Sequence, residues 1–292
     1  MRNSLDPPEE LLKALADHRA VLFAGAGLSR AEVHTETGTT EVSLPTWAEL
    51  LSDLLTRTKR LNPQETSELK RAIDFQRYGF VAQAIKERLT GGEFDDALDE
   101  IFPERLQPTK RHRLITEIPF SAVVTTNYDK LLESAYASRQ FSPRKYTFRQ
   151  APRIISALRK GDFFVLKAHG DIDDKDSIIL SEHDYRQLLY KEPGYRAVLN
   201  TIFIMRTVLF IGTSLTDVDL RLVLEWISET FDRRGPVHFA LVPGEGVGTS
   251  EVKHWREFFG IELILYDPSD GHREVDTFLE RLRVVQGGTS LH

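Results

Sequence analysis

The chain contains no cysteine among its 292 residues. Disulfide bonds, thiol nucleophiles, iron–sulfur clusters and cysteine-ligated zinc are therefore excluded. Histidine is present nine times, but never in the HExxH spacing that places two zinc ligands on one face of a helix. We expect a protein without a bound metal, whose activity survives chelators.

Long hydrophobic runs are also missing. No apolar segment approaches the roughly 20 residues that span a bilayer, and the N-terminus carries no uninterrupted apolar stretch of the signal-peptide kind. The sequence therefore predicts a cytoplasmic protein. The net charge of −6 argues against nucleic-acid binding as its main role, because phosphate binding relies on an excess of lysine and arginine. One basic group is interpreted as a solvated helix face; it comprises Arg105, Lys110, Arg111 and Arg113.

Several common catalytic and ligand-binding motifs are absent as well. The chain has neither the GxxxxGK[ST] phosphate loop nor the GxSxG nucleophile elbow. An acidic run at 171–176 superficially resembles a calcium loop. Lys175 falls where an oxygen ligand is needed and Asp176 where the turn needs glycine, so we reject a calcium site.

Four short polar motifs, each directly after an apolar run, are the most informative feature that is present. The four segments are Val21 to Ser29 (VLFAGAGLS), Ala122 to Asp129 (AVVTTNYD), Phe163 to Asp171 (FFVLKAHGD) and Thr207 to Asp217 (TVLFIGTSLTD). Their apolar runs are rich in Val, Phe and Leu, which is typical of strands buried on both faces. In an open parallel sheet, ligands bind just beyond the carboxyl ends of the strands. The four strand ends therefore predict one site, assembled from distant parts of the sequence.

Predicted strands and helices alternate from Ala122 onward. Further strands are predicted at Val237 to Val242 and Ile261 to Tyr266. Helices are expected after the capping residue Asp6, from Tyr128, near Glu182 to Tyr190, at Gly194 to Met205, at Asp217 to Phe231, from Ser250, and at Glu274 to Val285. Such alternation produces right-handed crossovers. It predicts one α/β domain over residues 1–292, with a parallel sheet and helices on both faces.

The region between the first two predicted strands has helical patterns only. Thr46 with Glu49 reads as a capping box, and Asn62-Pro63-Gln64-Glu65 reads as another helix start. We predict an all-helical insertion over residues 46–118. Residues Glu32 to Leu44 lack a clear periodicity and are predicted to form a loop beside the first glycines.

Each polar motif admits a functional and a structural interpretation. Gly25-Ala26-Gly27, predicted where a strand turns into a helix, either lets a phosphate approach the backbone or forms a tight turn. Asn127 either holds a water or a sugar hydroxyl, or caps the helix that follows. A lone histidine is usually structural, but the position of His169 at a strand end favours a functional role. Gly212-Thr213-Ser214 either binds phosphate or ribose, or is a loop with a helix cap. Arg30 occupies the place of the third glycine of the dehydrogenase fingerprint, which disfavours hydride transfer.

Taken in order, GAGLS, TTNYD, AHG and GTSL resemble the sirtuin superfamily, the Rossmann-like proteins that cleave NAD at the nicotinamide–ribose bond. The stretches Leu44 to Leu51 and His169 to Tyr185 further resemble a bacterial sirtuin-like branch found in antiphage defence. The resemblance implies that Asn127 and His169 are the catalytic pair. It implies a binding set for NAD, the substrate, that comprises Gly25, Ala26, Gly27 and Ser29 at the pyrophosphate and ribose, Tyr128 and Asp129 at the nicotinamide carboxamide, and Gly212, Thr213 and Ser214 at the adenosine half.

Two departures from the deacylases of that superfamily favour hydrolysis. Their four zinc-ribbon cysteines and their P-D-F-R segment are both missing, although Trp47 is a candidate to shield the nicotinamide in place of that segment. We therefore expect an NAD glycohydrolase that releases nicotinamide and ADP-ribose and depletes NAD in antiphage defence. The alternatives are an NAD-dependent protein deacylase or ADP-ribosyltransferase, and a non-catalytic sensor of NAD or ADP-ribose.

Regulation is expected to come from assembly or from a second protein, because the predicted core and insertion use nearly all of the residues. We expect a homo-oligomer built in part through the insertion between Thr46 and Ile118. The resemblance implies a protein partner such as a defence ATPase or an Argonaute-like protein. The Glu32 to Leu44 segment would be a natural gate for the site.

Overall fold

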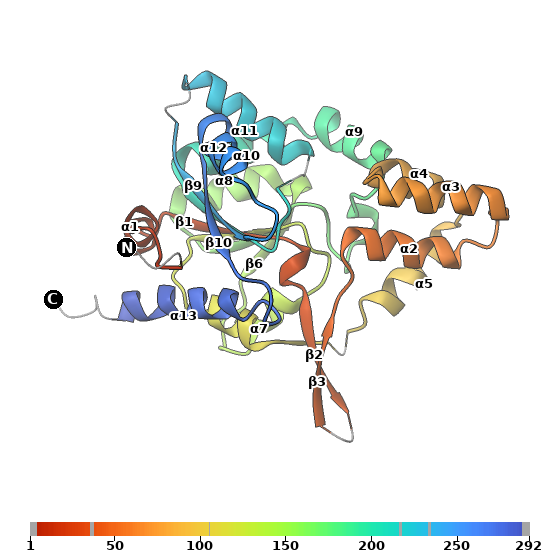
Figure 1. The fold of residues 1–292 in the computed structure, drawn as a ribbon, viewed down its shortest axis with the longest axis horizontal. Coiled ribbons are helices and arrows are strands. Elements are labelled where there is room, and N and C mark those ends of the chain that lie inside the picture. Colours follow the sequence, from red (N-terminus) through yellow and green to blue (C-terminus); the bar gives the residue numbers. More distant parts are fainter. Residues whose placement is uncertain (1–4, 36–37, 105, 216–217, 233–234, 288–292) are drawn as a thin grey trace.

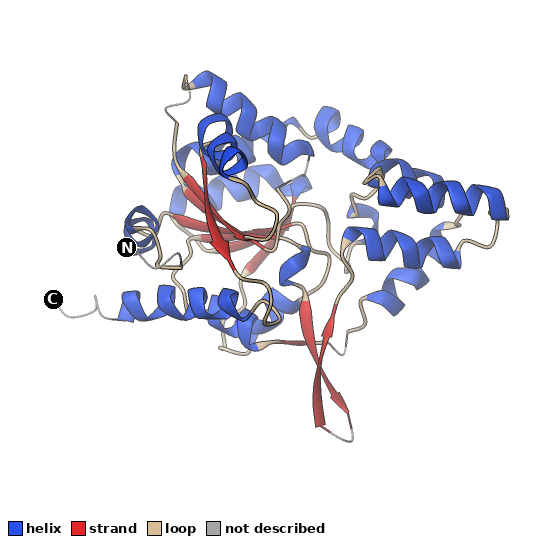
Figure 2. Cartoon of the chain, viewed as in Figure 1, coloured by secondary structure: helices blue, strands red, loops and turns tan. Residues whose placement is uncertain are grey.

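The centre of the molecule is a parallel β-sheet (Figures 1 and 2). The computed structural model describes residues 5–35, 38–104, 106–215, 218–232 and 235–287. The sheet has seven strands in the order β10-β9-β8-β1-β5-β7-β6. They are β1 (Ala20–Ala24), β5 (Ala122–Thr125), β6 (Arg144–Thr147), β7 (Phe164–Lys167), β8 (Thr207–Ile211), β9 (His238–Pro243) and β10 (Ile261–Tyr266). All neighbouring strands of this sheet pair in parallel, as predicted.

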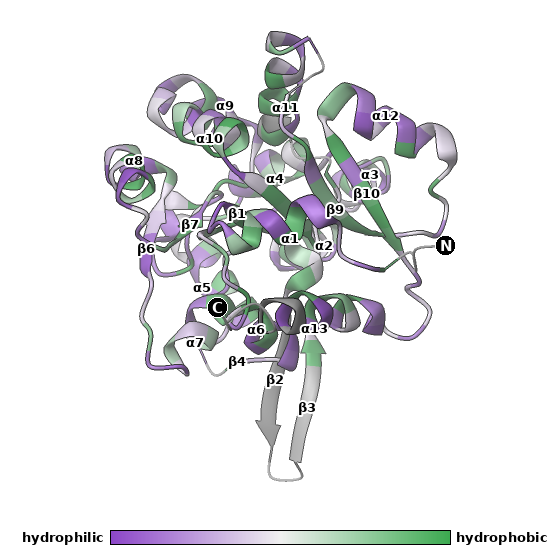
Figure 3. Cartoon of the chain, turned by 90° about the vertical axis from the view of Figure 1, so that its left-hand side faces the viewer, coloured by the Kyte–Doolittle hydropathy of each residue, from purple (hydrophilic) through white to green (hydrophobic). Residues whose placement is uncertain are grey.

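Helices cover both faces of the sheet because successive strand residues point to opposite sides. In β1, Val21 and Phe23 join one apolar core, whereas Leu22 joins the other. One face is covered by α8 (Ala151–Lys160), α10 (Pro193–Met205), α11 (Val218–Thr230) and α12 (Thr249–Phe259), and the other by α1 (Glu9–Ala16), α6 (Lys110–Ile115), α7 (Leu131–Ala137) and α13 (Arg273–Gly287). Figure 3 shows apolar strands at the centre and polar residues on the outer helices. The predicted α/β fold class is confirmed.

The strand order places the site. β1 lies between β5, the next strand of the sheet along the chain, and β8, which follows much later. The chain therefore runs outward in one direction after β1 and returns to the opposite side of it for β8. A crevice opens at such a reversal, at the carboxyl ends of the strands. All four predicted motifs follow β1, β5, β7 or β8, so they lie along one edge of the sheet.

Four helices after β1 form a lobe beside the sheet (Figure 1). They are α2 (Trp47–Arg57), α3 (Pro63–Asp74), α4 (Tyr78–Lys86) and α5 (Gly91–Ile101), called here the helical lobe, and they share an apolar core. The predicted capping box of Thr46 with Glu49 is present, and the predicted helix start at Asn62 is confirmed, with a capping box to Glu65. The lobe ends before residue 118, because Leu114 and Ile115 of α6 pack into the core beside the sheet.

Residues Glu32 to Leu44 do not form the predicted loop. Most of them belong to an antiparallel hairpin of β2 (Arg30–Thr35) and β3 (Gly38–Ser43), and β4 (Gln107–Pro108) pairs with β2. The segment is rich in threonine and valine, which favour extended backbone. The hairpin extends away from the main sheet (Figure 2). The hairpin does not lie between layers of helices, so its strands need no long apolar run. The loop was predicted because the segment lacks a clear hydrophobic pattern.

One prediction about local structure near the sheet is also wrong, and one strand of the sheet was missed. The N-cap of α1 is Pro8, without a side-chain cap, because the carboxylate of Asp6 pairs with Arg281 of α13 instead (2.9 Å). The edge strand β6 was not predicted, because its sequence, RKYT, contains no apolar run. None of the helices in the described ranges has the length and apolar character needed to cross a bilayer.

A buried histidine gives the fold a pH dependence that we can predict. The side chain of His238 in β9 is buried, and the amide of Val208 donates to its Nδ1 (3.2 Å). Burial, opposed in part by a hydrogen bond to the main chain of Phe203, lowers the pKa of His238 to about 4. The unfolded chain has the ordinary histidine pKa of about 6.5. Between these values the unfolded state binds a proton that the folded state does not, so stability is complete above about pH 6.5 and falls as the pH decreases.

The free energy of unfolding is expected to be about 2 kcal/mol lower near pH ~5 than near pH ~7.5 because of His238 alone. Urea unfolding of the wild type and of His238→Gln at both pH values measures this contribution. The variant should be less stable than the wild type at the higher pH and should lose about 2 kcal/mol less on acidification. Parallel pH profiles of the two proteins would contradict the assignment.

Candidate active site

A cleft of about 1240 Å³ lies at the carboxyl edge of the sheet, between the strand ends and the helical lobe. Ligand pockets commonly have volumes of about 300–1,000 Å³, so this cleft has room for a dinucleotide. Its lining includes every predicted binding residue and one of the two predicted catalytic residues. These are Gly25, Ala26, Gly27, Ser29, Asn127, Tyr128, Asp129, Gly212, Thr213 and Ser214. The structure therefore brings together residues from three of the four motifs around one cavity.

The glycines of the first motif are required by close packing. A Cβ at Gly25 would lie 2.5 Å from the oxygen of Gly212, and a Cβ at Gly27 would lie 2.9 Å from the Cα of Gly212. Gly212 itself has a φ of +70°, and a Cβ there would lie 2.5 Å from the amide nitrogen of Leu28. Two turns, after β1 and after β8, thus touch backbone to backbone. The glycines therefore form tight turns, as one of the two interpretations predicted. The backbone of these turns lines the cleft.

The turn after β1 is a single 3-10 turn, Ala26–Leu28, that leads into β2, and not the start of an α-helix as predicted. Its amides are largely used within the protein. Gly25 N donates to Ile211 O (3.0 Å), Gly27 N donates to Gly212 O (2.8 Å), and Leu28 N donates to Gly25 O (2.9 Å). An anion at this turn would therefore meet fewer free amides than at the N-terminus of a regular helix.

Asn127 is held at the end of β5 by two hydrogen bonds. Its side-chain Nδ2 donates to Gly25 O (3.0 Å), and its main-chain N–H donates to the hydroxyl of Thr125 (3.1 Å). The helix-capping interpretation of Asn127 is wrong, because α7 begins at Leu131, whose amide donates to the carboxylate of Asp129 (3.0 Å). The Asn127 carboxamide instead joins two strand ends and lines the cleft.

The neighbours of Asn127 have side chains engaged in packing and hydrogen bonding. The hydroxyl of Ser29 donates to the carboxylate of Asp129 (2.7 Å), and both side chains are buried. The hydroxyl of Tyr128 donates to Ile179 O (2.8 Å), while its ring packs edge-on against Phe102 at 6.0 Å. These contacts fix the backbone around Asn127. The contacts of Tyr128 and Asp129 with a nicotinamide stay a prediction.

His169 lies at the end of β7, the strand beside β5, and is 1% exposed. Its ring is 5.4 Å from that of Tyr185, in an edge-on contact, and 6.3 Å from that of Trp47. Trp47 and Tyr185 both line the cleft. The histidine therefore sits behind an aromatic wall made by the helical lobe and α9 (Glu182–Lys191). A substrate reaches its ring only if these aromatic side chains move or leave a gap.

An ion pair joins the helical lobe to α9. Lys86 of α4 pairs with Asp184 of α9 at 2.8 Å. The same carboxylate accepts hydrogen bonds from the amides of Leu180 and Ser181 (3.1 and 2.9 Å). Burial works against the ionised form of Asp184, yet hydrogen bonding, with Lys86 foremost, holds its pKa below the usual range. One carboxylate therefore both begins α9 and fastens the lobe above His169.

The turn after β8 completes the edge of the cleft. Leu215 N donates to the hydroxyl of Thr213 (3.2 Å), and Ser214 is exposed beside it. Thr213 also packs against Gly25, since a Cβ at that glycine would lie 2.9 Å from the Thr213 Cβ. The expected helix from Asp217 begins at Val218 in the described residues, and Asp217 itself lies outside them.

Sequence reasoning missed the residues at the far end of the cleft. Tyr266 and His272 line it, with the Tyr266 hydroxyl 2.8 Å from His272 Nδ1. Tyr266 ends β10, so applying the strand-end rule to this last strand would have found it. Arg111, predicted to lie on a solvated helix face, is instead buried and pairs with Asp276 of α13 at 2.7 Å. Arg111 lies in α6, which packs against α13, and the sequence of α6 does not reveal this contact.

No group of three histidine, aspartate or glutamate side chains suited to a metal ion occurs among the described residues. The expectation that chelators leave the activity intact stays a prediction, and activity with and without EDTA is the measurement that tests it.

Comparison with known proteins agrees with the motifs. Residues 121–264 match the SIR2-like domain family. The chain is 27% identical over 238 residues to the NAD(+) hydrolase ThsA of Bacillus cereus (strain MSX-D12), covering 81% of this chain and 46% of that protein. It is 28% identical over 236 residues to the NAD(+) hydrolase ThsA of Enterococcus faecium, covering 79% and 44%.

A third similar protein is named as a sirtuin of bacterial defence. The chain is 28% identical over 137 residues to defense-associated sirtuin 2 of Bacillus subtilis, covering 46% of this chain and 13% of that protein. The chain spans less than half of the length of the three relatives described here. The resemblance drawn from the four strand-end motifs is thus confirmed for the segment 121–264, which matches the SIR2-like domain family.

Proposed function

We propose that this chain hydrolyses NAD at the bond between nicotinamide and ribose, releasing nicotinamide and ADP-ribose. The observation that carries the proposal is the cleft at the carboxyl edge of the sheet, which Asn127 lines and which Trp47 and Tyr185 separate from His169. The similarity to proteins named NAD(+) hydrolase supports it.

Loss of nicotinamide leaves a sugar with oxocarbenium character, which water then attacks. Asn127 is fixed through its Nδ2 by Gly25 O, so its carbonyl oxygen is the group that orients a water or a ribose hydroxyl. His169 accepts a proton and orients the ribose, close to the aromatic wall. The turns of Gly25 and Gly212 lie at the floor of the cleft and hold the remainder of the dinucleotide while the bond breaks.

The helical lobe favours water over a peptide as the acceptor. Trp47 of the lobe and Tyr185 of α9 cover the ring of His169, and Trp47 also contacts Tyr78 edge-on at 5.9 Å. An apolar wall of this kind suits a planar leaving group such as nicotinamide. Deacylation and ADP-ribosyl transfer, which need a peptide or protein acceptor beside this wall, stay the alternatives.

Incubation of the purified protein with NAD, followed by chromatography of the products, tests the proposed function. We expect nicotinamide and ADP-ribose in equal amounts, with no requirement for a peptide. Consumption of an acyl-peptide or labelling of a protein acceptor would point to a deacylase or an ADP-ribosyltransferase. NAD retained unchanged on the protein would point to a sensor, and either result would overturn the proposal.

The proposed biological role is depletion of NAD during phage infection. It is supported by the similarity to a protein named defense-associated sirtuin 2. Bacteria that express this chain should lose NAD after phage challenge, and cells with an Asn127→Ala variant should keep it. Equal NAD levels in the two strains after infection would count against this role.

A cell that carries an NAD hydrolase must restrain it, so we also propose a homo-oligomer in contact with a second protein. The proposed partner is a defence ATPase or an Argonaute-like protein. The helical lobe, fastened above His169 by Lys86 and Asp184, is the element through which assembly would reach the site. Light scattering during size-exclusion chromatography, combined with the NAD assay, should give an oligomer whose activity depends on its assembly state. A monomer that hydrolyses NAD at the full rate by itself would refute this arrangement.

A further inference from the structure

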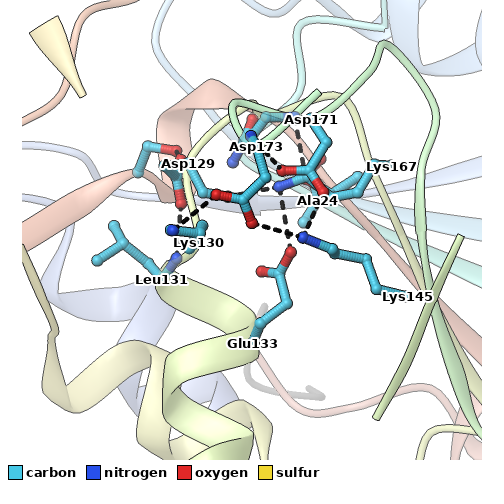
Figure 4. Close-up of polar contacts among 12 residues, drawn as sticks. Ala24, Asp129, Lys130, Leu131, Glu133, Lys145, Lys167, Asp171 and Asp173 are labelled. Carbon is cyan, nitrogen blue, oxygen red and sulfur yellow. Dashed lines mark hydrogen bonds and ion pairs between the residues drawn. The ribbon is translucent and has the colours of Figure 1, made fainter. Parts of the chain in front are cut away.

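A lysine, Lys167, is completely buried at the end of β7, and Figure 4 shows it near Asp129 and Glu133. The side chain of Lys167 is 0% exposed. Its Nζ donates to the main-chain oxygen of Asp129 and lies 3.3 Å from Oε1 of Glu133 in α7. Lysine is almost never fully buried unless it is paired, so a buried ammonium group at this point of the sheet needs a physical reason.

The position of Lys167 links the two proposed catalytic residues. Lys167 stands two residues before His169, and its acceptor Asp129 stands two residues after Asn127. A single ammonium group therefore ties the backbone after β5 to the end of β7. The amide of Ile172 joins the same two loops by donating to the oxygen of Tyr128 (3.2 Å).

Two further lysines fasten the loop after His169 from outside. Lys145 of the edge strand β6 lies 2.5 Å from the carboxylate of Asp171 and 2.8 Å from that of Asp173. Lys130, from the loop after β5, also reaches Asp173 at 2.7 Å (Figure 4). Burial works against the charge on Lys145, yet its hydrogen bonds to Asp171 and Asp173 raise its pKa. These pairs are partly exposed and salt weakens them, whereas the contacts of Lys167 are shielded from solvent.

Stability alone is a poor reason for the buried pair of Lys167 and Glu133. Apolar residues of similar size often replace a buried ion pair without loss of stability. The pair with Glu133 can be replaced together by neutral residues, whereas the hydrogen bond to the Asp129 oxygen has no apolar equivalent. That bond fixes where the backbone of the Asn127 loop lies relative to β7.

We propose that Lys167 is a positioning residue, whose ammonium group sets the distance between the backbone that carries Asn127 and the backbone that carries His169. The catalytic consequence rests on the proposed function, whereas the effect on the two loops does not. Misplacing a reacting group by about 1 Å costs about 100-fold in rate, so loss of this tie should lower kcat and leave nucleotide binding unchanged.

The test compares Lys167→Met with the double variant Lys167→Met/Glu133→Gln. The single variant leaves the Glu133 carboxylate buried without its cation, and the protein should lose stability. The double variant removes that uncompensated charge, so its thermal midpoint should recover most of the loss, although the Asp129 oxygen still lacks this donor. Its kcat for NAD cleavage should still be about 100-fold lower, with KM and the affinity for ADP-ribose unchanged within about twofold. Lys110→Met, which removes an exposed pair with Glu280 (2.7 Å), is the control and should keep the wild-type kcat.

Hydrogen exchange measured by mass spectrometry provides a readout that does not need activity. In the double variant, amides at 126–131 and 168–172 should exchange faster, while those of α8 stay unchanged. Recovery of stability together with a wild-type kcat would overturn the proposal, because Lys167 would then serve only to balance a charge. Unchanged exchange in the two loops would overturn it as well. If the wild type cleaves no NAD, the proposed function fails, and faster exchange confined to the two loops still upholds the positioning role.

Discussion

Replacing Asn127 by alanine is expected to lower the rate of NAD cleavage by at least about 100-fold, because the group that orients the attacking water or the ribose is lost. The fold should survive. The side chain contributes one hydrogen bond, from Nδ2 to Gly25 O (3.0 Å), which is worth about 1 kcal/mol. The measurement is the initial rate of nicotinamide release at saturating NAD, with circular dichroism to verify the fold. His169→Ala is expected to behave in the same way, because the proton acceptor is removed.

A second asparagine provides the matched control for this experiment. Asn200 lies in α10, away from the residues that line the cleft, and is also partly shielded from solvent. Asn200→Ala should keep the wild-type rate, so that any loss in Asn127→Ala reports the site and not the loss of an amide in general. A folded Asn127→Ala protein with unchanged turnover would remove Asn127 from the mechanism.

The second large effect is expected for Gly212→Ala, which should lower the free energy of unfolding and abolish the activity. The φ of +70° costs alanine about 1–2 kcal/mol. In addition, the new Cβ would lie 2.5 Å from Leu28 N and 2.8 Å from the carbonyl carbon of Gly27, which are backbone atoms that cannot rotate away. The turns after β1 and β8 must therefore separate. We expect a loss of about 3 kcal/mol or more in the free energy of unfolding.

Gly246→Ala separates backbone strain from steric overlap. Gly246 has a φ of +79° but no atom within 4 Å of the position that a Cβ would take. Its replacement should cost only about 1–2 kcal/mol and leave the activity unchanged. Urea unfolding of both variants gives the difference directly. Equal losses of stability would show that the close approach of the two turns does not matter, and would undermine the packing account of Gly25 and Gly27.

Much of the fold was predictable because its signals are local. A strand buried on both faces needs a continuous apolar run, and the runs that end at Ala24, Thr125, Lys167 and Ile211 are all strands of the sheet. Capping boxes are equally local, since Thr46 and Glu49 bond to each other across a single helical turn. The cleft residues followed from the same logic, because the ends of parallel strands share one edge.

Other elements depended on partners far away in the chain. Asp6 had the sequence of a helix cap, but an arginine in the last helix binds its carboxylate. Arg111 had the pattern of a solvated face, but α13 covers it. The hairpin after β1 and the edge strand β6 lack apolar runs, because neither is covered by helices on both sides as a central strand is.

The sequence by itself determined the α/β class, the strands of the central sheet, the starts of two lobe helices, and the motifs that line the cleft. Those features follow from periodicity, capping chemistry and strand ends, which involve residues close together in the chain. Only the tertiary structure decided that the glycine turns pack against each other, that the helical lobe covers His169, and that Lys167 joins the two proposed catalytic strand ends. Each of these is a contact between segments separated by tens of residues or more, and a spacing along the chain does not encode which distant surface will meet it.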